Sequence, residues 1–246
     1  MLHETMPPER IYVFQHVACE NLGTFAAVLA RRGYRPEYIR LFAGDSIPDD
    51  WSLAAALIVL GGPMSVNDAP RLAYLAQERA MLREALGRSQ PILGVCLGAQ
   101  LLAAAAGSQV FAAARPELGW GGVSLTVEGR QDALVASLAE VGSVFHWHGE
   151  TFDLPLGATR LAFSALTMNQ AIRIGTNAYG LQFHLEVDAP MIQSWIREYL
   201  QDLGADSRST AERLAAETAQ YVGPLRTAAA AVMNRFLDLV AVATGS

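Results

Sequence analysis

Cysteine and clustered positive charge are both scarce in this chain of 246 residues. Its two cysteines, Cys19 and Cys96, are too few for a disulfide framework, so a reducing compartment is the simpler expectation. The net charge is −6 and no run of arginine or lysine gathers along the chain, which argues against a nucleic-acid-binding surface. Residues 1–10 lack the basic start and apolar core of a signal peptide. We therefore expect a cytoplasmic protein.

No uninterrupted apolar run is long enough to span a bilayer. The strongest candidate lies between Arg88 and Arg115, where no residue is charged. Glycine, proline, serine and glutamine interrupt this stretch, and its residues change from β-like before Cys96 to helix-like after it. The stretch therefore predicts a buried strand, a turn and a buried helix in a soluble protein that does not engage a membrane.

Apolar strands alternate with helices through the first half of the chain. Strands are predicted at 11–14, 38–41, 56–60 and 92–95, and helices at 25–32 and 72–86. Fully apolar strands in this alternation predict an α/β fold whose parallel sheet is covered on both faces. Short β-rich runs are expected to extend the sheet, in part as antiparallel strands, at 122–127, 143–147, 161–163, 171–174 and 179–183. A helix is expected over 188–199.

The last part of the chain is rich in alanine and has a different pattern. Ser209 and Glu212 fit a capping box, and Gly223-Pro224 places a helix stop beside a helix start. An apolar stripe through Phe236 predicts packing against the protein's own domain or pairing in a homodimer. We therefore divide the chain into an α/β domain over 1–204 and a C-terminal helical extension over 205–246.

Cys96 stands where an apolar strand meets an apolar helix, in Gly94-Val95-Cys96-Leu97-Gly98. A nucleophile on such a turn adopts a strained backbone, so the residues two positions away must be small. The helix that follows presents its positive dipole end, which favours thiolate over thiol. The backbone N–H of Leu97 would point towards an oxyanion. On this pattern alone, a small buried cysteine between two core elements is the alternative interpretation.

A histidine and a glutamate follow the final apolar strand, in Gln182-Phe183-His184-Leu185-Glu186. Residues two apart on an extended chain point to one side, so His184 and Glu186 can reach each other. The carboxylate would fix the imidazole tautomer and leave the other ring nitrogen for the thiol. A lone histidine and glutamate at a solvated strand end is the plainer alternative.

Gly61-Gly62-Pro63 ends a neighbouring buried strand. In an open α/β sheet the active site forms outside the carboxyl ends of the strands. Glycine lets a backbone N–H approach a substrate closely, so we expect Gly62 to be the second oxyanion donor. An ordinary strand terminator is the alternative. The three patterns all lie at strand ends of one sheet, and together they favour a cysteine-based active site.

These motifs resemble those of a known family. Residues 94–100 and 182–186 resemble the nucleophile and His/Glu motifs of class I glutamine amidotransferases, especially stand-alone proteins similar to the amidotransferase domain of GMP synthase. Further matches lie at 61–67, 119–120 and 146–153, so the resemblance covers residues from about 11 to 200. One departure is Leu185, where many relatives have proline, and we interpret it as a subgroup trait.

The resemblance implies a fold, a triad and a substrate site. The fold is a doubly wound, mostly parallel, flavodoxin-like sheet, and the triad is Cys96, His184 and Glu186. The remaining implied residues hold the α-amino and carboxylate ends of glutamine: Gln100 and the backbone of Trp147, Gly149 and Glu150.

Two histidines offer a different chemistry. His146 and His148 alternate on one predicted strand and could be metal ligands, but the sequence gives them no cysteine partner and no evident third ligand. A substrate-lining or structural role is the favoured interpretation, so we expect no metal and no cofactor. Cys19 is interpreted as a small buried residue near the first helix.

The expected reaction is hydrolysis of the glutamine γ-carboxamide through a γ-glutamyl thioester, with release of ammonia. The sequence has no Gly-x-x-x-x-Gly-Lys-Ser/Thr phosphate loop, so ammonia would pass to a separate synthetase. Alternatively, the substrate is another γ-glutamyl compound and the protein is a γ-glutamyl peptidase with the same triad. A third interpretation is a catalytically silent binding protein on the same fold. The presence of all three triad residues argues against it.

Overall fold

The structure is a computed structural model that describes residues 10–199, 201 and 207–245. The predictions made for residues 1–9 and the proposed boundary at 204/205 therefore lie outside the described residues. In chain order, the strands and helices are β1 (Arg10–Gln15), α1 (Phe25–Arg31), β2 (Arg35–Arg40), β3 (Ala56–Val59), α2 (Ala73–Gly87), β4 (Ile92–Val95), α3 (Leu97–Ala105), β5 (Val110–Gly121), β6 (Ser124–Leu125), α4 (Val127–Gln131), β7 (Val144–Phe152), β8 (Thr159–Phe163), β9 (Ala171–Ile174), β10 (Ala178–Leu181), α5 (Ala189–Glu198) and α6 (Ser207–Thr244).

The central sheet has the strand order β2-β1-β3-β4-β10-β9-β8-β6. Strand β1 pairs in parallel with β2 and β3, and β4 pairs in parallel with β3 and β10. Every residue of β3 and β4 is buried, as their continuous apolar sequence predicted. Beyond β10 the pairings are antiparallel. The predicted mostly parallel sheet with an antiparallel extension is confirmed.

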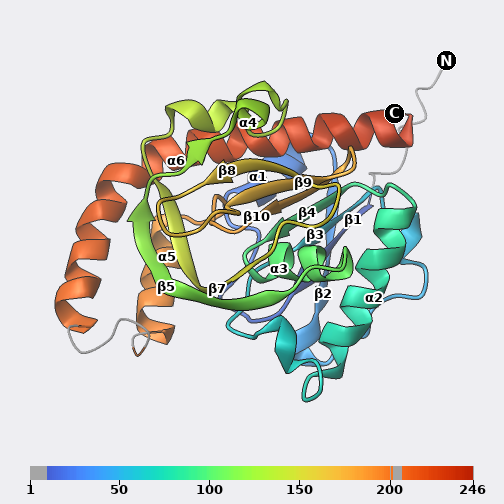
Figure 1. Ribbon diagram of the computed structural model, residues 1–246, viewed down its shortest axis with the longest axis horizontal. Coiled ribbons are helices and arrows are strands. Elements are labelled where there is room, and N and C mark those ends of the chain that lie inside the picture. Colours follow the sequence, from blue (N-terminus) through green and yellow to red (C-terminus); the bar gives the residue numbers. More distant parts are fainter. Residues whose placement is uncertain (1–9, 200, 202–206, 246) are drawn as a thin grey trace.

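The run at 143–147 does not extend this sheet, so that prediction was wrong. It belongs to β7, which pairs with β5 in a separate antiparallel sheet of two long, curved strands (Figure 1). The register slips between Ala112 and Glu117, a segment that contains Pro116, which has no backbone donor. Most of β5 from Phe111 to Pro116 is exposed, so the apolar pattern that reveals buried strands is missing there.

The run at 122–127 forms less strand than predicted. Ser124 and Leu125 pair with β8, but Val127 already begins α4. The reason is a helix cap, because the Thr126 hydroxyl accepts a hydrogen bond from the Gly129 backbone N–H at 2.9 Å.

Helices cover both faces of the central sheet (Figure 1). One buried cluster joins the sheet to α1, α5 and α6, and includes Phe25, Trp195 and Phe236. A second cluster joins the opposite face to α2 and α3, and includes Leu82 and Leu102. Successive residues of β1 and β3 alternate between the two clusters, as they must in a sheet that is buried on both sides. The doubly wound α/β fold is confirmed.

The tail packs on the protein's own domain. Helix α6 contacts α1 and α5, and Phe236, Leu237 and Val240 are fully buried. An ion pair between Arg32 and Asp238, with N and O atoms 2.9 Å apart, joins the end of α1 to α6. Of the two alternatives raised for the apolar stripe, packing within the chain is the one observed.

The predicted division of the tail into two helices was wrong. Residues 207–244 form one helix that includes Ser209, so Ser209 is not its cap, and Pro224 lies inside it. Figure 1 shows α6 as an orange and a red part that differ in direction. An internal proline removes one helical hydrogen bond and bends the helix, so Pro224 accounts for the bend without a helix end.

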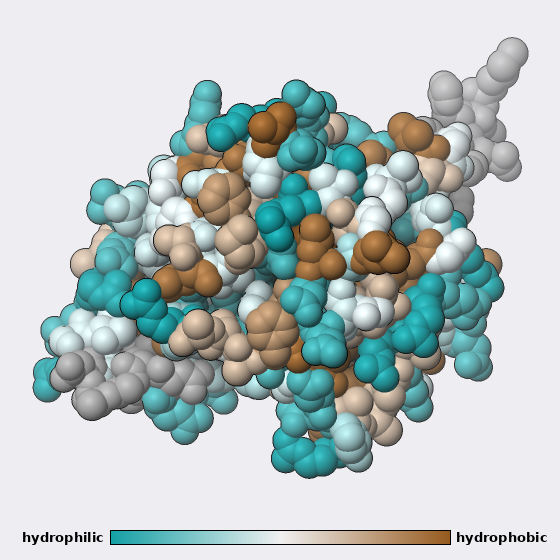
Figure 2. Space-filling view, viewed as in Figure 1, coloured by the Kyte–Doolittle hydropathy of each residue, from teal (hydrophilic) through white to brown (hydrophobic). Residues whose placement is uncertain are grey.

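Within the described residues, α6 is also the one helix that is long and apolar enough to cross a membrane by length and composition. A core helix of a soluble protein meets the same criterion, and the apolar stripe of α6 lies in the buried cluster described above. Figure 2 shows polar and apolar residues interspersed over the face in view.

Candidate active site

A cavity of about 770 Å³ lies at the carboxyl ends of neighbouring parallel strands. Glu20 follows β1, Gly62 follows β3, Cys96 follows β4 and His184 follows β10, and all four line the cavity. The sheet therefore brings together residues that are far apart in the sequence. This is the edge at which open α/β sheets bind their ligands.

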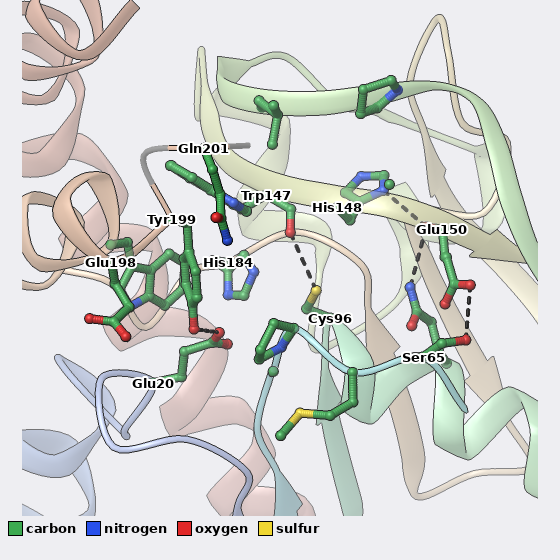
Figure 3. A pocket seen from close by; sticks show the side chains of 18 of the residues that line it. Glu20, Ser65, Cys96, Trp147, His148, Glu150, His184, Glu198, Tyr199 and Gln201 are labelled. Atoms are coloured by element: carbon green, nitrogen blue, oxygen red, sulfur yellow. Dashed lines mark hydrogen bonds between the residues drawn. The ribbon is translucent and has the colours of Figure 1, made fainter. Parts of the chain in front are cut away.

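Cys96 occupies a strained turn between β4 and α3. Its φ of 51° and ψ of −108° are sparsely populated by residues other than glycine. Two backbone hydrogen bonds hold this conformation: the Cys96 N–H donates to Leu181 O at 2.8 Å, and Cys96 O accepts from Gln100 N at 3.1 Å. The turn presents the Cys96 Sγ to the cavity, 3.7 Å from the backbone oxygen of Trp147 (Figure 3).

His184 and Glu186 form a buried pair beside Cys96. The His184 Nδ1 lies 2.7 Å from the Glu186 Oε1, and the two side chains are 1% and 2% exposed. A Cβ added to Gly61 would stand 3.2 Å from His184 Cε1 and 3.5 Å from Cys96 Cβ, so histidine and cysteine are close neighbours. Burial alone would lower the pKa of His184, but Glu186 and Cys96 together raise it well above its ordinary value.

Two further contacts fix the plane of the His184 ring. The His184 backbone N–H donates to Phe145 O at 2.8 Å. The Trp195 indole lies edge-on to the imidazole, with ring centroids 4.7 Å apart. With Nδ1 facing Glu186, the ring is held so that Nε2 is the nitrogen available to Cys96 or to a substrate.

Gly62 and Leu97, the residues predicted to supply the oxyanion donors, are neighbours. A Cβ on Gly62 would stand 3.1 Å from the Leu97 side chain and 2.9 Å from His16 Cβ, so this glycine passes close to the start of α3. Leu97 is the first residue of α3, where a backbone N–H has no partner within the helix.

A buried pair supports this loop from behind. The His16 ring contacts Gly61 O at 3.1 Å and Glu78 Oε2 at 2.9 Å. Burial lowers the pKa of His16, but Glu78 outweighs that effect, so the net shift is upward. Because a carbonyl oxygen only accepts, the His16 Nδ1–H donates to Gly61 O and holds the backbone that leads to Gly62.

The residues predicted to hold the glutamine ends also line the cavity. Among them, Glu150 lies on the side away from Glu20 (Figure 3). The Gln100 amide donates to Glu150 O at 3.2 Å, and Ser65 Oγ donates to Glu150 Oε1 at 2.9 Å. Trp147 and Gly149 lie on the same strand, β7. Gln100 and Glu150 therefore lie together, and the backbone oxygen of Trp147 faces Cys96, while the Trp147 ring packs on Trp195 and Tyr199.

Sequence reasoning missed the opposite side of the cavity. Glu20 is 6% exposed and its Oε1 accepts a hydrogen bond from the Tyr199 hydroxyl at 3.0 Å. Burial raises the pKa of Glu20, and His184 opposes that shift. Glu20 follows the first strand, so the strand-end rule that led to Gly62 could have found it. Tyr199 is the last residue of the helix predicted at 188–199. An aromatic residue at helical spacing normally indicates a core position, so the sequence did not mark Tyr199 as a site residue.

Cys19 lies beside this region and differs from its prediction, because it is half-buried rather than buried. Its Sγ lies 3.3 Å from the Tyr199 hydroxyl. Burial raises the pKa of the Cys19 thiol, so the thiol, which is less nucleophilic than the thiolate, prevails at neutral pH.

The structure supplies a third neighbour for the two histidines. Glu117, His146 and His148 have ligand atoms within 4.8 Å of one another. Burial lowers the pKa of both histidines, that of His148 to about 4. The donor set could hold a divalent metal, yet both Glu117 oxygens already accept hydrogen bonds, from Ser164 at 2.7 Å and Gln170 at 2.8 Å. These bonds occupy the half-buried Glu117 carboxylate, whereas both ring nitrogens of His146 and Nε2 of His148 have no hydrogen-bond partner within the described residues.

Known proteins share this sequence pattern. Residues 20–198 match the family model described as glutamine amidotransferase class-I. The chain is 29% identical over 197 residues to YfeJ of Salmonella typhimurium, a glutamine amidotransferase-like protein; the match covers 79% of this chain and 82% of that protein. It is 38% identical over 175 residues to a glutamine-hydrolysing GMP synthase subunit of Natronomonas pharaonis, covering 70% and 87%. With GMP synthase of Porphyromonas gingivalis it shares 34% over 152 residues, 61% of this chain but 28% of that longer enzyme.

Solved structures share the fold. A glutamine amidotransferase of Thermotoga maritima superposes with a TM-score of 0.84 at 27% identity, covering 94% of this chain and 98% of that one. A glutamine amido transferase of Methylobacillus flagellatus gives a TM-score of 0.85 at 28% identity, covering 96% of each chain. The matched family model and these shared folds lead to one conclusion: the chain belongs to the class I glutamine amidotransferase family.

Proposed function

We propose that this protein hydrolyses the γ-carboxamide of glutamine, or of another γ-glutamyl compound, through Cys96, His184 and Glu186. The observation that carries the proposal is the strained turn of Cys96 beside a histidine whose far nitrogen is held by a buried carboxylate. Packing alone requires neither a strained nucleophile nor an oriented base, and the two stand together at one edge of the sheet.

The proposed chemistry runs in two halves. The Cys96 thiolate attacks the γ-carbonyl carbon, and the N–H groups of Gly62 and Leu97 stabilise the resulting oxyanion. His184 gives its proton to the departing nitrogen, which leaves a γ-glutamyl thioester on Cys96. Water, deprotonated by His184, then attacks the thioester carbon and releases glutamate and the free thiol. These steps use no cofactor or metal.

Gln100 and the backbone of Trp147, Gly149 and Glu150 are the groups that we propose hold the amino-acid end of the substrate. All four line the cavity into which the thiol points, and the Gln100 amide donates to Glu150 O at 3.2 Å. Two free cysteines in the described residues suit the reducing conditions of the cytoplasm.

If glutamine is the substrate, the ammonia needs an acceptor. The relative from Natronomonas pharaonis is named as one subunit of a GMP synthase, and that name implies a companion chain. We therefore propose a separate ammonia-accepting synthetase as the partner for that reaction.

A γ-glutamyl hydrolase is the second candidate, because the cavity is larger than a free amino acid requires. It extends past His184 to Glu20, Glu198 and Tyr199. A cavity of about 770 Å³ falls in the size range that holds ligands larger than glutamine, roughly 300–1,000 Å³.

The test is the release of glutamate from glutamine and from simple γ-glutamyl amides. Wild-type protein should release glutamate and ammonia, or glutamate and amine, in equal amounts. Cys96→Ala should be folded and inactive, since it removes only the sulfur and keeps the Cβ at the turn, whereas Cys19→Ala should stay active. An active Cys96→Ala protein would overturn the proposal.

A further inference from the structure

The catalytic geometry fixes where a leaving group must lie. His184 protonates the departing nitrogen, so that nitrogen must come within hydrogen-bond reach of its ring. If Gln100 and Glu150 hold the glutamyl end on one side of Cys96, the leaving group extends to the other side. In Figure 3 that side is formed by Glu20, Glu198 and Tyr199. We call these three residues, with Trp195 and Gln201, the leaving-group recess.

The recess is acidic and aromatic. Its charged side chains are the carboxylates Glu20 and Glu198, and no arginine or lysine lines the cavity among the residues that the structure describes. Trp195 and Tyr199 supply aromatic rings, and Trp195 packs directly on His184. Aromatic faces and carboxylates are the groups that proteins use to bind organic cations. An anionic leaving group would be repelled by both glutamates.

Glu20 gives the recess a carboxylate oxygen beside the reacting atoms. Its side chain is buried and its Oε1 accepts from Tyr199, but no described residue donates a hydrogen bond to its Oε2. This oxygen lies 2.2 Å from the position of a Cβ added to Gly61, and His184 Cε1 lies 3.2 Å from the same point. The free oxygen is therefore next to the catalytic histidine. Glu20 lines the cavity, so this oxygen is placed to accept a charge-assisted hydrogen bond from a ligand N–H⁺.

We infer that the leaving-group recess binds a cationic amine, and that the preferred substrates are γ-glutamyl amides of diamines or polyamines. The inference rests on the proposed function. In the reaction, Cys96 Sγ bonds to the carbonyl carbon of the γ-amide and the C–N bond breaks. The His184 proton passes to the leaving nitrogen, and the amine departs. Water then converts the thioester to glutamate, so that one amide and one water give one glutamate and one amine.

Within this recess Glu20 and Glu198 have different tasks. Glu20 is buried beside the reacting atoms, so it meets the part of the amine nearest the scissile bond. Glu198 is exposed at the end of α5 and meets a charge farther along the chain. Ammonia would use neither the length of the recess nor its second carboxylate, so glutamine should be the poorer substrate.

The test compares three γ-glutamyl amides of matched length, formed from 1,4-diaminobutane, butylamine and 4-aminobutanoate, with glutamine alongside. We expect kcat/KM to fall from the cationic to the neutral to the anionic amide, with a cationic-to-neutral ratio on the order of tenfold, as one charge-assisted hydrogen bond gives. Equal or reversed preference among the amides would overturn the inference, while hydrolysis of any of them would leave the proposed function standing. Inactivity towards all four compounds would overturn both.

Substitutions then assign the preference to residues. Glu20→Gln keeps the size of the side chain and can keep its contact with Tyr199, so it should fold and should bring the cationic-to-neutral ratio close to one. Glu198→Gln should reduce the same ratio by less. The matched control is Asp68→Asn, which removes a cavity-lining carboxylate that accepts from Ser65, the residue that in turn contacts Glu150, and it should leave the ratio unchanged. If Glu20→Gln slows the cationic and neutral amides equally, Glu20 serves the reaction but does not select the amine, and the inference fails.

Discussion

Replacing Gly98 by alanine should destabilise the protein because α3 packs directly on the backbone of β3. A Cβ on Gly98 would lie 2.0 Å from Val59 O and 2.7 Å from Val59 C. Backbone atoms cannot swing aside as a flexible side chain can, so the helix and the strand must move apart. Inserting atoms into a packed core costs about 1–3 kcal/mol, sometimes more. We expect about 3 kcal/mol at Gly98, which for a domain of this size lowers the Tm by roughly 6–12 °C.

Gly87 provides the matched control, since it also lies in a helix and a Cβ there would meet nothing within 4 Å. Gly87→Ala should be neutral or stabilising by about 0.4–1 kcal/mol. Urea unfolding followed by fluorescence measures both free energies of unfolding, and thiol labelling of Cys96 reports whether the turn has opened. If Gly98→Ala proves as stable as wild type, the close packing of α3 on β3 is not what holds the nucleophile turn.

Two further pairs of substitutions test the triad and the tail. Glu186→Gln should keep measurable activity where His184→Ala keeps almost none, a difference on the order of 10–100-fold in kcat, because the carboxylate orients the ring but transfers no proton. Since Glu186 raises the pKa of His184, Glu186→Gln should also shift the alkaline limb of the kcat/KM profile to lower pH; an unshifted limb would contradict that role. Phe236→Ala on α6 should cost about 3–5 kcal/mol in urea unfolding because Phe236 is fully buried. Val242→Ala on the same helix should cost under about 0.5 kcal/mol because Val242 is 83% exposed. Equal losses of unfolding free energy in the Phe236 and Val242 variants would contradict the burial of Phe236 against the domain.

The nucleophile turn could be predicted from the sequence because its physical demands are local. A short apolar strand after Pro91, an apolar helix after Cys96 and glycine at 94 and 98 together allow few other arrangements. The structure shows the reason for both glycines, since a Cβ on Gly94 would lie 2.5 Å from Gly98 O. The central sheet was predictable for a related reason, because its buried strands are continuous apolar runs.

Other features depend on contacts that no local pattern records. Strand β5 was missed because most of its first half faces solvent and it pairs with β7 across a register slip. Its residue Glu117 therefore could not be placed beside His148 in advance. Glu20 is buried by residues from the far end of the domain, such as Tyr199, and a glutamate in a polar loop carries no sign of that burial. The bend at Pro224 looked like a helix end because proline favours both.

Covalent labelling with a glutamine-like electrophile tests the central claim most directly. Tryptic mass spectrometry of the labelled protein identifies which cysteine carries the γ-glutamyl-like adduct. We predict that Cys96 is modified, that glutamine or a γ-glutamyl amide slows its modification, and that Cys19, with its raised pKa, is spared. His184→Ala should label more slowly at Cys96, since it removes the group that pairs with the thiolate. Equal labelling of Cys19 and Cys96, with no protection by substrate, would contradict the assignment of Cys96 as the nucleophile.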